Sequence, residues 1–371
     1  MDVARIKDNF AKVAAHGDDV VLFFFADLFL RNPQTRDLFP VSMVAMRAHL
    51  LGALARIIAE VDNIGQLTVY LQDLGRRHRK FGTVAEHYEP VGASLLASLA
   101  HFSGPDWTDE LAADWEAAYQ LIAGVMIEAA ELDAKVNPPY WDATVLSVQM
   151  PAFDVAVIKV ATLERLDYLP GQSVAISTEL RHRLWRYYSM ANAPRDNGTL
   201  EFHVRVVEGG AVSMALARGL GPGARLRLGP PVGSLSYDAA AGRKVLLVAG
   251  STGLAPVKAI AEQLSALAQP PDTTLLFGAR TAEGLYDLPE LEKLSARAPW
   301  LTVVPCVSGE QGYQGERGTL PDVLSRIGTW TGHDAYIAGS SQLVAAATAR
   351  LETLGVPNDH VHAEDFGWSE P

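Results

Sequence analysis

The chain has 371 residues, 49% of them hydrophobic and 20% charged, a balance typical of a globular protein with two or three domains. Its net charge of -12 argues against a nucleic-acid or anionic-membrane partner, because such surfaces usually require an excess of lysine and arginine. A single cysteine, Cys306, excludes a disulfide within the chain, and no run of eighteen uncharged apolar residues predicts membrane insertion. We therefore expect a cytoplasmic protein, and we expect a monomer.

Residues 1–134 predict an all-helical domain. Apolar residues recur there at helical spacing, for example at Leu111, Trp115, Tyr119, Ile122 and Met126. The segment 135–139 ends in two prolines, which cannot continue a helix and which disfavour helix in the residue before them. A domain boundary is expected at this segment.

The remaining chain predicts two more domains. Between 139 and 238, runs such as 200–206 alternate apolar and polar residues with the period of a β-strand, and turns such as Pro170-Gly171 separate them. This pattern favours an antiparallel β-barrel. Between 243 and 371, apolar strands at 245–249, 274–277 and 336–338 alternate with helical segments, which indicates an α/β Rossmann-like domain with a parallel sheet.

A glycine-rich turn follows the strand at 245–249 and leads into a helix. The turn and helix start comprise Gly250, Ser251, Thr252, Gly253, Leu254, Ala255 and Pro256. Glycines let backbone N–H groups approach a pyrophosphate, and the helix N-terminus adds partial positive charge. The third glycine of the dinucleotide fingerprint is absent, so the turn alone is equally compatible with a plain strand-to-helix connection.

Two segments of the predicted barrel suggest a flavin site. The first contains Arg186, Tyr187, Tyr188 and Ser189. An arginine can hold a flavin phosphate, a tyrosine can pack on the isoalloxazine ring, and a hydroxyl can bond its edge. The second, with Gly209, Gly210 and Ser213, opens a helix toward the pyrophosphate. By itself, the first segment is also compatible with an ordinary strand.

Five motifs occur in a fixed order along the second part of the chain. They are Pro170-Gly171-Gln172, Arg186-x-Tyr188-Ser189, Gly209-Gly210-x-x-Ser213, Gly250-x-x-Gly253-x-x-Pro256 and Glu364-Asp365-Phe366-Gly367. In order and spacing they resemble the ferredoxin reductase family. The resemblance implies FAD on the barrel, a nicotinamide dinucleotide on the α/β domain and Phe366 as a shield of the flavin face. Ala338, which precedes Gly339, departs from the family, because the family usually has a cysteine at this position. NADH is the family's preference, but NADPH stays open, because Arg280 could meet a ribose phosphate or simply cap a strand end.

His78 is the candidate metal ligand of the helical part. A neutral imidazole suits iron, and the neighbouring arginines can pair with haem propionates, although an isolated histidine is more often a surface or satisfied residue. The surrounding motifs are Phe25, Asn32-Pro33, Phe39, Tyr88-x-x-Val91-Gly92 and Trp115-x-x-x-Tyr119. Together they resemble the globin part of flavohaemoglobins, joined to a reductase in that family's order. The resemblance implies a globin fold with haem b, His78 as the proximal ligand, Phe39 packed on the haem and Tyr88 in the hydrogen-bonded support of His78.

Departures from this family lie mainly on the distal side. Phe25 matches the position of a distal tyrosine and has no hydroxyl to donate. The distal glutamine matches Met46, while His49 is an alternative one helical turn away. Glu128 and Glu131 both flank the place of the proximal glutamate and are also compatible with solvated helix charges.

The resemblance implies an activity for the whole chain. Electrons would pass from NAD(P)H through FAD to haem, and nitric oxide and oxygen would give nitrate. Two alternatives stay open: a diaphorase-like reductase with another electron acceptor, and a haem gas sensor. The apolar side chain of Phe25 motivates the first alternative, because a hydrogen bond to bound oxygen contributes on the order of 1 kcal/mol.

Overall fold

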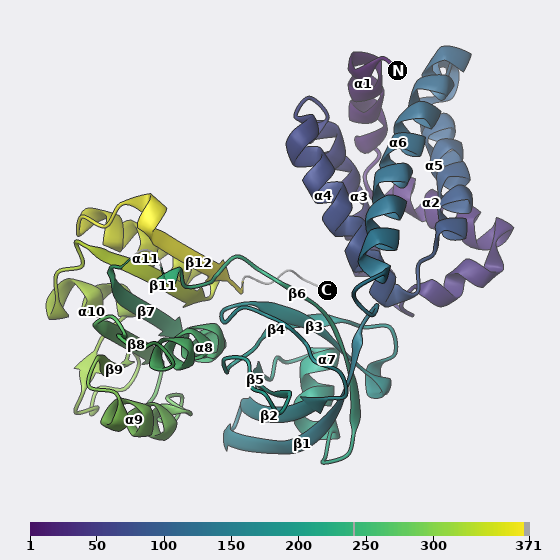
Figure 1. The fold of residues 1–371 in the computed structure, drawn as a ribbon. Helices are drawn as coiled ribbons and strands as arrows, with labels where there is room; N and C mark the ends of the chain where they lie inside the picture. Colours follow the sequence, from purple (N-terminus) through teal and green to yellow (C-terminus); the bar gives the residue numbers. More distant parts are fainter. Residues whose placement is uncertain (240–241, 367–371) are drawn as a thin grey trace. The chain divides into compact units, whose positions relative to one another are not determined.

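The computed structural model describes residues 1–239 and 242–366, which fall into two compact units, one spanning 1–140 and one beginning at Trp141. The first unit is helical (Figure 1). Its helices are α1 (Val3–Ala14), α2 (Asp18–Arg31), α3 (Val44–Glu60), α4 (Ile64–His78), α5 (Tyr88–Ser103) and α6 (Asp109–Ala134). The predicted all-helical first part is therefore confirmed.

Several of these helices begin at a polar residue that caps the first turn. The side chains of Asp2, Asn63 and Thr108 accept hydrogen bonds from backbone N–H groups at the starts of α1, α4 and α6. Such bonds satisfy donors that the first helical turn leaves without a partner. The local sequence thus sets where these helices start.

Two glycines allow helices of the first unit to approach closely. A Cβ on Gly75 of α4 would lie 2.2 Å from the carbonyl oxygen of Met126 in α6. A Cβ on Gly92 of α5 would lie 2.3 Å from the ring of Tyr119. Any side chain at Gly75 would force the two backbones apart, so α4, which ends at His78, is seated directly on α6.

The second unit begins with an antiparallel sheet of strands β1 (Trp141–Ala152), β2 (Val155–Thr162), β3 (Ser173–Thr178), β4 (Arg186–Ser189), β5 (Thr199–Arg205) and β6 (Arg225–Val232). The strand order is β4-β3-β6-β1-β2-β5. An antiparallel bridge between Met190 and Phe202 links the two outer strands of this order, which closes the sheet as a barrel. The helix α7 (Ala211–Met214) contributes Val212 to the apolar core of the barrel.

A parallel sheet follows, with strands β7 (Lys244–Gly250), β8 (Thr273–Ala279), β9 (Leu301–Val307), β10 (Glu316–Arg317), β11 (His333–Gly339) and β12 (Val361–Asp365) in the order β10-β9-β8-β7-β11-β12. Its helices are α8 (Leu254–Ser265), α9 (Leu288–Arg297), α10 (Leu320–Ile327) and α11 (Ser341–Thr353). Alternate residues of β7 face two different cores: Leu247 packs in one that contains Val257 of α8, and Leu246 in one that contains Ala347 of α11. Both faces of the sheet are therefore covered (Figure 1), and the predicted fold classes of all three parts are confirmed.

Candidate functional site

The glycine-rich turn lies where the strand order of the parallel sheet reverses. From β7 the chain continues to β8 on one side, and β11 pairs on the other side. Ligands of open α/β sheets bind at such a switch point, outside the carboxyl ends of the strands. The turn after β7 is therefore in the position expected of a dinucleotide site.

The turn itself has the geometry of an anion site. A Cβ on Gly253 would lie 2.1 Å from the carbonyl oxygen of Ala338, so only glycine fits. Ser251 adopts a left-handed backbone with φ of 52°, a conformation that is rare outside glycine and often found at ligand sites. No side chain caps the 3-10 turn 251–253 that leads into α8, so the first N–H groups of that turn have no side-chain acceptor and can meet phosphate oxygens, and Pro256 in the first turn of α8 has no N–H to lose. Thr252 is half-buried in the turn, and Leu254 and Ala255 are buried in the first turn of the helix.

Strand β4 carries the predicted flavin residues. Tyr188 is half-buried, and burial raises its pKa above the usual range, which keeps the phenol neutral. Tyr187 on the other face is 45% exposed. Arg186 donates from Nη1 to the carbonyl oxygen of Trp185 at 2.8 Å. Ser189 Oγ is buried and has no hydrogen-bond partner within the described part of the chain.

A second unpaired buried atom lies on the C-terminal strand. Glu364 Oε2 also lacks a hydrogen-bond partner among the described residues. Burial raises the pKa of Glu364 to about 7, while a hydrogen bond from Ser173 opposes that shift. Ser173 pairs directly with Ser189 across β3 and β4. Buried polar atoms without partners are costly, so this group of side chains fits the polar edge of a bound flavin.

The last described strand, β12, and the residue after it lie next to this group of polar side chains. Glu364 pairs with Ala338 of β11, which is fully buried, so the residue predicted to stand in place of the family's cysteine lies beside the predicted flavin edge. Asp365 accepts a hydrogen bond from Ser341 Oγ at 2.8 Å. The backbone N–H of Phe366 donates to Gly339 O at 2.8 Å, and its side chain is 36% exposed. The predicted residue Gly367 lies outside the described residues.

The segment after β5 forms the second predicted phosphate turn. Ser213 Oγ accepts from Val207 N at 3.2 Å and donates to Gly210 O at 3.2 Å. A Cβ on Gly210 would lie 2.6 Å from Ser213 Oγ. Ser213 therefore closes the turn from within, and Gly210 provides the space it needs.

In the first unit, the surroundings of His78 favour the neutral imidazole that a metal ligand requires. It is the last residue of α4, and its Nδ1 donates to Leu74 O at 2.6 Å. Burial lowers the pKa of the imidazole, which favours the neutral form. With the proton on Nδ1, the lone pair on Nε2 is left for a metal. The residue present therefore fits proximal ligation of haem iron.

The predicted distal residues pack together. Phe25 is 6% exposed, and its ring centroid lies 5.7 Å from that of Phe29 and 5.4 Å from that of Phe39. Met46 packs against the same cluster, whereas His49 is exposed. The structure therefore favours Met46 over His49 as the distal side chain.

The predicted proximal support is only partly assembled. Tyr88 is half-buried beside Leu74, and its backbone oxygen accepts a hydrogen bond from Tyr119. The described partner of His78 Nδ1 is Leu74 O. Glu128 and Glu131 are both exposed, which agrees with solvated helix charges. A role of Tyr88 in supporting His78 stays a prediction.

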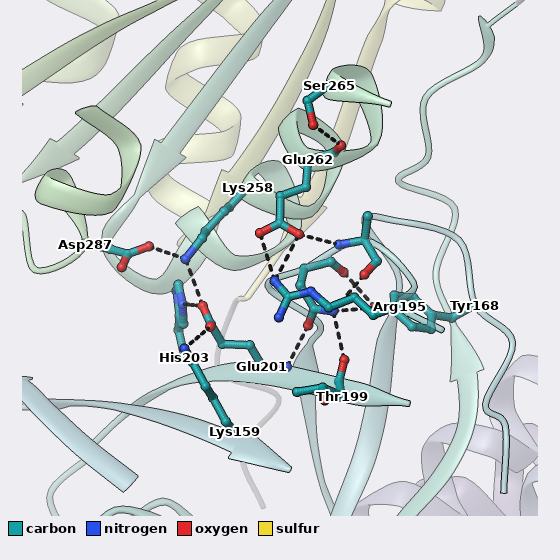
Figure 2. Close-up of polar contacts among 12 residues, drawn as sticks. Lys159, Tyr168, Arg195, Thr199, Glu201, His203, Lys258, Glu262, Ser265 and Asp287 are labelled. Atoms are coloured by element: carbon teal, nitrogen blue, oxygen red, sulfur yellow. Dashed lines mark hydrogen bonds and ion pairs between the residues drawn. The ribbon is translucent and has the colours of Figure 1, made fainter. Parts of the chain in front are cut away.

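Sequence reasoning missed a buried charged cluster in the second unit. Glu201 and His203 alternate with apolar residues along β5, which suggests a solvent-facing side, yet they are only 5% and 4% exposed. Figure 2 shows the ammonium group of Lys258 between Glu201 and Asp287, with His203 beside Glu201. The only sequence signal was a lysine within the otherwise apolar start of α8.

Comparisons with known proteins agree with this organisation. The globin family matches residues 22–126, the oxidoreductase FAD-binding domain matches 142–237, and the oxidoreductase NAD-binding domain matches 247–349. The flavohemoprotein of Bordetella pertussis is 29% identical over 98% of this chain and 97% of its own length. The reductase component of the naphthalene 1,2-dioxygenase system of Pseudomonas putida, a ferredoxin–NAD(P)+ reductase, is 31% identical over 66% of this chain and 75% of its own length.

A solved structure shares the whole fold. The flavohemoglobin from Malassezia yamatoensis, which holds FAD and heme, has a TM-score of 0.79 at 17% identity and covers 98% of each chain. No helix in residues 1–239 and 242–366 combines the length and apolar character needed to span a bilayer. A globin domain is thus joined to FAD-binding and NAD-binding oxidoreductase domains, the arrangement for which haem, FAD and a nicotinamide dinucleotide are the cofactors. The chain therefore belongs to the flavohaemoglobin family of oxidoreductases, whose second part is a reductase of the ferredoxin reductase type.

Proposed function

We propose that the protein is a nitric oxide dioxygenase that uses electrons from NAD(P)H. The observation that carries this proposal is a half-buried histidine in a globin fold, His78, whose Nδ1 donates to Leu74 O, on the same chain as FAD-binding and NAD-binding oxidoreductase domains. Each nitric oxide combines with one oxygen and one electron to give one nitrate, so one NAD(P)H supports two turnovers. A solved FAD/NAD-binding domain of a nitric oxide dioxygenase from Vibrio cholerae shares the fold of the second part, with a TM-score of 0.55 and 22% identity.

The chain's own residues bind and orient the reactants. The chemistry that FAD and haem supply when bound is the conversion of a hydride into single electrons and the reaction of oxygen with nitric oxide. The uncapped turn 251–253 before α8 would hold the dinucleotide pyrophosphate, and Ser189 with Glu364 would hydrogen-bond the flavin edge. His78 would hold the iron, while the apolar Phe25 and Met46 would exclude water from the opposite side.

The test is nitric oxide consumption by purified protein loaded with haem and FAD. With NADH and oxygen present, we expect stoichiometric nitrate. His78→Ala should abolish this reaction and leave NADH-driven reduction of ferricyanide unchanged, because FAD and NADH bind the other unit. Absence of nitric oxide consumption by the fully loaded protein would reject the proposal. The same assay with NADPH in place of NADH, compared by kcat/KM, shows which dinucleotide the protein prefers.

A reductase that serves another electron acceptor is the second candidate. The distal cluster of Phe25, Phe29, Phe39 and Met46 offers no hydroxyl or amide to bound oxygen. Relatives at 31% identity are reductase components of oxygenase systems. Rapid turnover with quinones or an external haem protein, unchanged in His78→Ala and without any nitric oxide consumption by the parent protein, would favour this candidate. A cytoplasmic location and a monomeric state stay predictions from the sequence.

A further inference from the structure

A buried ion cluster joins the FAD-binding barrel to the NAD-binding sheet. Lys258 of α8 is 8% exposed, and its Nζ donates to Glu201 Oε1 of β5 at 2.8 Å and to Asp287 Oδ2 at 2.6 Å. His203 Nε2 lies 3.0 Å from Glu201 Oε1, and Tyr286 Oη lies 2.8 Å from His203 Nδ1 (Figure 2). The cluster therefore contains side chains from both parts of the reductase and connects them through one ammonium group.

Lys258 and Glu201 both keep their charges in this environment. Burial would raise the pKa of Glu201, but His203 and Lys258 hold it well below its usual range. Burial would lower the pKa of Lys258, but Asp287 and Glu201 keep it above the usual value. Ligand atoms of Glu201, His203 and Asp287 lie within 4.8 Å of one another, as around a metal ion, yet Lys258 already supplies the cation. A buried charge is costly without its partners, so the cluster favours one placement of α8 on the barrel.

A second contact holds the same helix one turn further along. Glu262 lies four residues after Lys258, on the same face of α8. Its carboxylate accepts from the backbone N–H of Ala193 at 3.1 Å and from Arg195 Nη2 at 3.2 Å, both in the barrel segment between β4 and β5. Two adjacent turns of α8 are therefore attached to the barrel, which resists both sliding and rotation of the helix (Figure 2).

The barrel side of this joint is itself rigid. Asn192 is fully buried, and its Oδ1 accepts from Glu201 N at 2.7 Å. Its Nδ2 donates to Thr199 O at 3.1 Å and to Ala193 O at 2.7 Å, and its backbone oxygen accepts from Tyr168 Oη at 2.7 Å. The two places that receive Lys258 and Glu262 are thus linked through one amide side chain.

The helix that is held in this way also begins at the dinucleotide turn. Lys258 lies four residues after Leu254, so it is about 6 Å along the axis from the start of α8. Because a helix moves as a rigid rod over this distance, a shift at Lys258 moves the pyrophosphate site by a similar amount. Hydride transfer is sensitive to such shifts: a misplacement of about 1 Å can reduce a rate by about 100-fold.

We propose that Lys258 is a positioning residue for hydride transfer: by bridging Glu201 and Asp287 it fixes α8 on the barrel and thereby sets the approach of the nicotinamide ring to the flavin. This inference rests on the NAD(P)H-to-FAD half of the proposed function and is independent of the reaction at the haem. Lys258 touches neither reactant in this scheme and acts through the helix that it holds.

The test compares Lys258→Met with Lys159→Met in the holoprotein, with NADH as donor and ferricyanide as acceptor. Lys159 also pairs with Glu201, at 3.5 Å, but it belongs to β2 of the barrel and is 44% exposed, so its loss leaves α8 attached. For Lys258→Met we expect full FAD content, a kcat at least about 10-fold lower and a KM for NADH within about 3-fold of the parent value. The isotope effect of 4-deuterated NADH on kcat should be retained or larger. Lys159→Met should stay within about 2-fold in kcat.

Two results would overturn the proposal. One is an unchanged kcat in a Lys258→Met protein that holds its FAD. The other is an equal loss of kcat in Lys159→Met, since that would assign the effect to the charge of Glu201 alone. If Lys258→Met does not fold, the triple variant Lys258→Met, Glu201→Gln, Asp287→Asn decides, because it removes the ion bridge that holds α8 without leaving a buried charge unpaired. It should lower kcat severalfold at unchanged KM, and an unchanged kcat rejects the proposal. Ferricyanide reduction requires no nitric oxide, so the proposed dioxygenase activity can fail without affecting this result.

Discussion

Substitution of Gly75 by alanine tests whether the contact between α4 and α6 holds the helix that carries His78. The new Cβ would lie 2.2 Å from Met126 O and 2.8 Å from Met126 Cα, and both are backbone atoms that cannot rotate away. Restoring an ordinary contact of about 3.4 Å requires the helices to separate locally by about 1.2 Å. Forced separations of this kind cost about 1–3 kcal/mol, while replacing a helical glycine by alanine returns about 1 kcal/mol. Because the clash is with backbone atoms, the cost lies in the upper part of this range, about 2–3 kcal/mol, and we expect a net loss of about 1–2 kcal/mol.

The assay is thermal unfolding of the full chain, followed by loss of the haem Soret band. For a unit of this size, the expected loss lowers Tm by roughly 3–8 °C. Gly52→Ala is the matched control: Gly52 is exposed within α3, and its added Cβ would meet nothing within 4 Å. Because only the helix propensity changes there, Tm should rise by a few degrees. A Tm of Gly75→Ala at or above that of the parent protein would refute the argument from close approach.

Three further predictions concern the cofactor sites. The pKa of Glu364 is about 7 in the folded protein and about 4.5 in the unfolded chain, so between these pH values the folded state binds the extra proton. The contribution of Glu364 to the free energy of unfolding is therefore complete below pH 4.5 and is lost as pH rises to about 7. Partial exposure limits this contribution to about 1–2 kcal/mol, and Glu364→Gln should flatten the urea-unfolding profile of the FAD-free chain between pH 5 and 7. Phe25→Tyr adds a donor to the distal cluster and should slow oxygen dissociation, measured by laser photolysis, by about 10-fold; an unchanged rate would place Phe25 away from the ligand. Gly253→Ala places a Cβ 2.1 Å from Ala338 O and should raise the KM for NADH at least about 10-fold, with FAD content as the control. A wild-type KM would argue against dinucleotide binding at this turn.

Much of the fold could be predicted from local patterns. The change of hydrophobic period after residue 139 separated helices from strands, because each element buries one face and repeats with its own geometry. The glycine turn at 250–253 was predictable for a similar reason, since a strand followed by glycines and a helix start is a local feature. Motif order along the chain carried the family resemblance, which the matches to globin, FAD-binding and NAD-binding families bear out.

Other features depend on contacts between distant segments. Met46 and His49 share one helix face in the sequence, and only the packing of α3 against the phenylalanine cluster distinguishes them. Likewise, Glu364 and Ser189 belong to separate sequence motifs. Only the structure shows that Ser173 lies beside both, so that their unpaired buried atoms can belong to one binding site.

The sequence by itself thus determined the three fold classes, their order and the residue types of the predicted cofactor sites, because these follow from periodicity and short motifs. The tertiary structure alone decided which polar residues are buried. Glu201 and His203 alternate along β5 as solvent-facing residues would, and they are buried because α8 lies over them with Lys258 as their counter-charge. A strand's own period records only that its two faces differ, and the partner that covers each face comes from elsewhere in the chain.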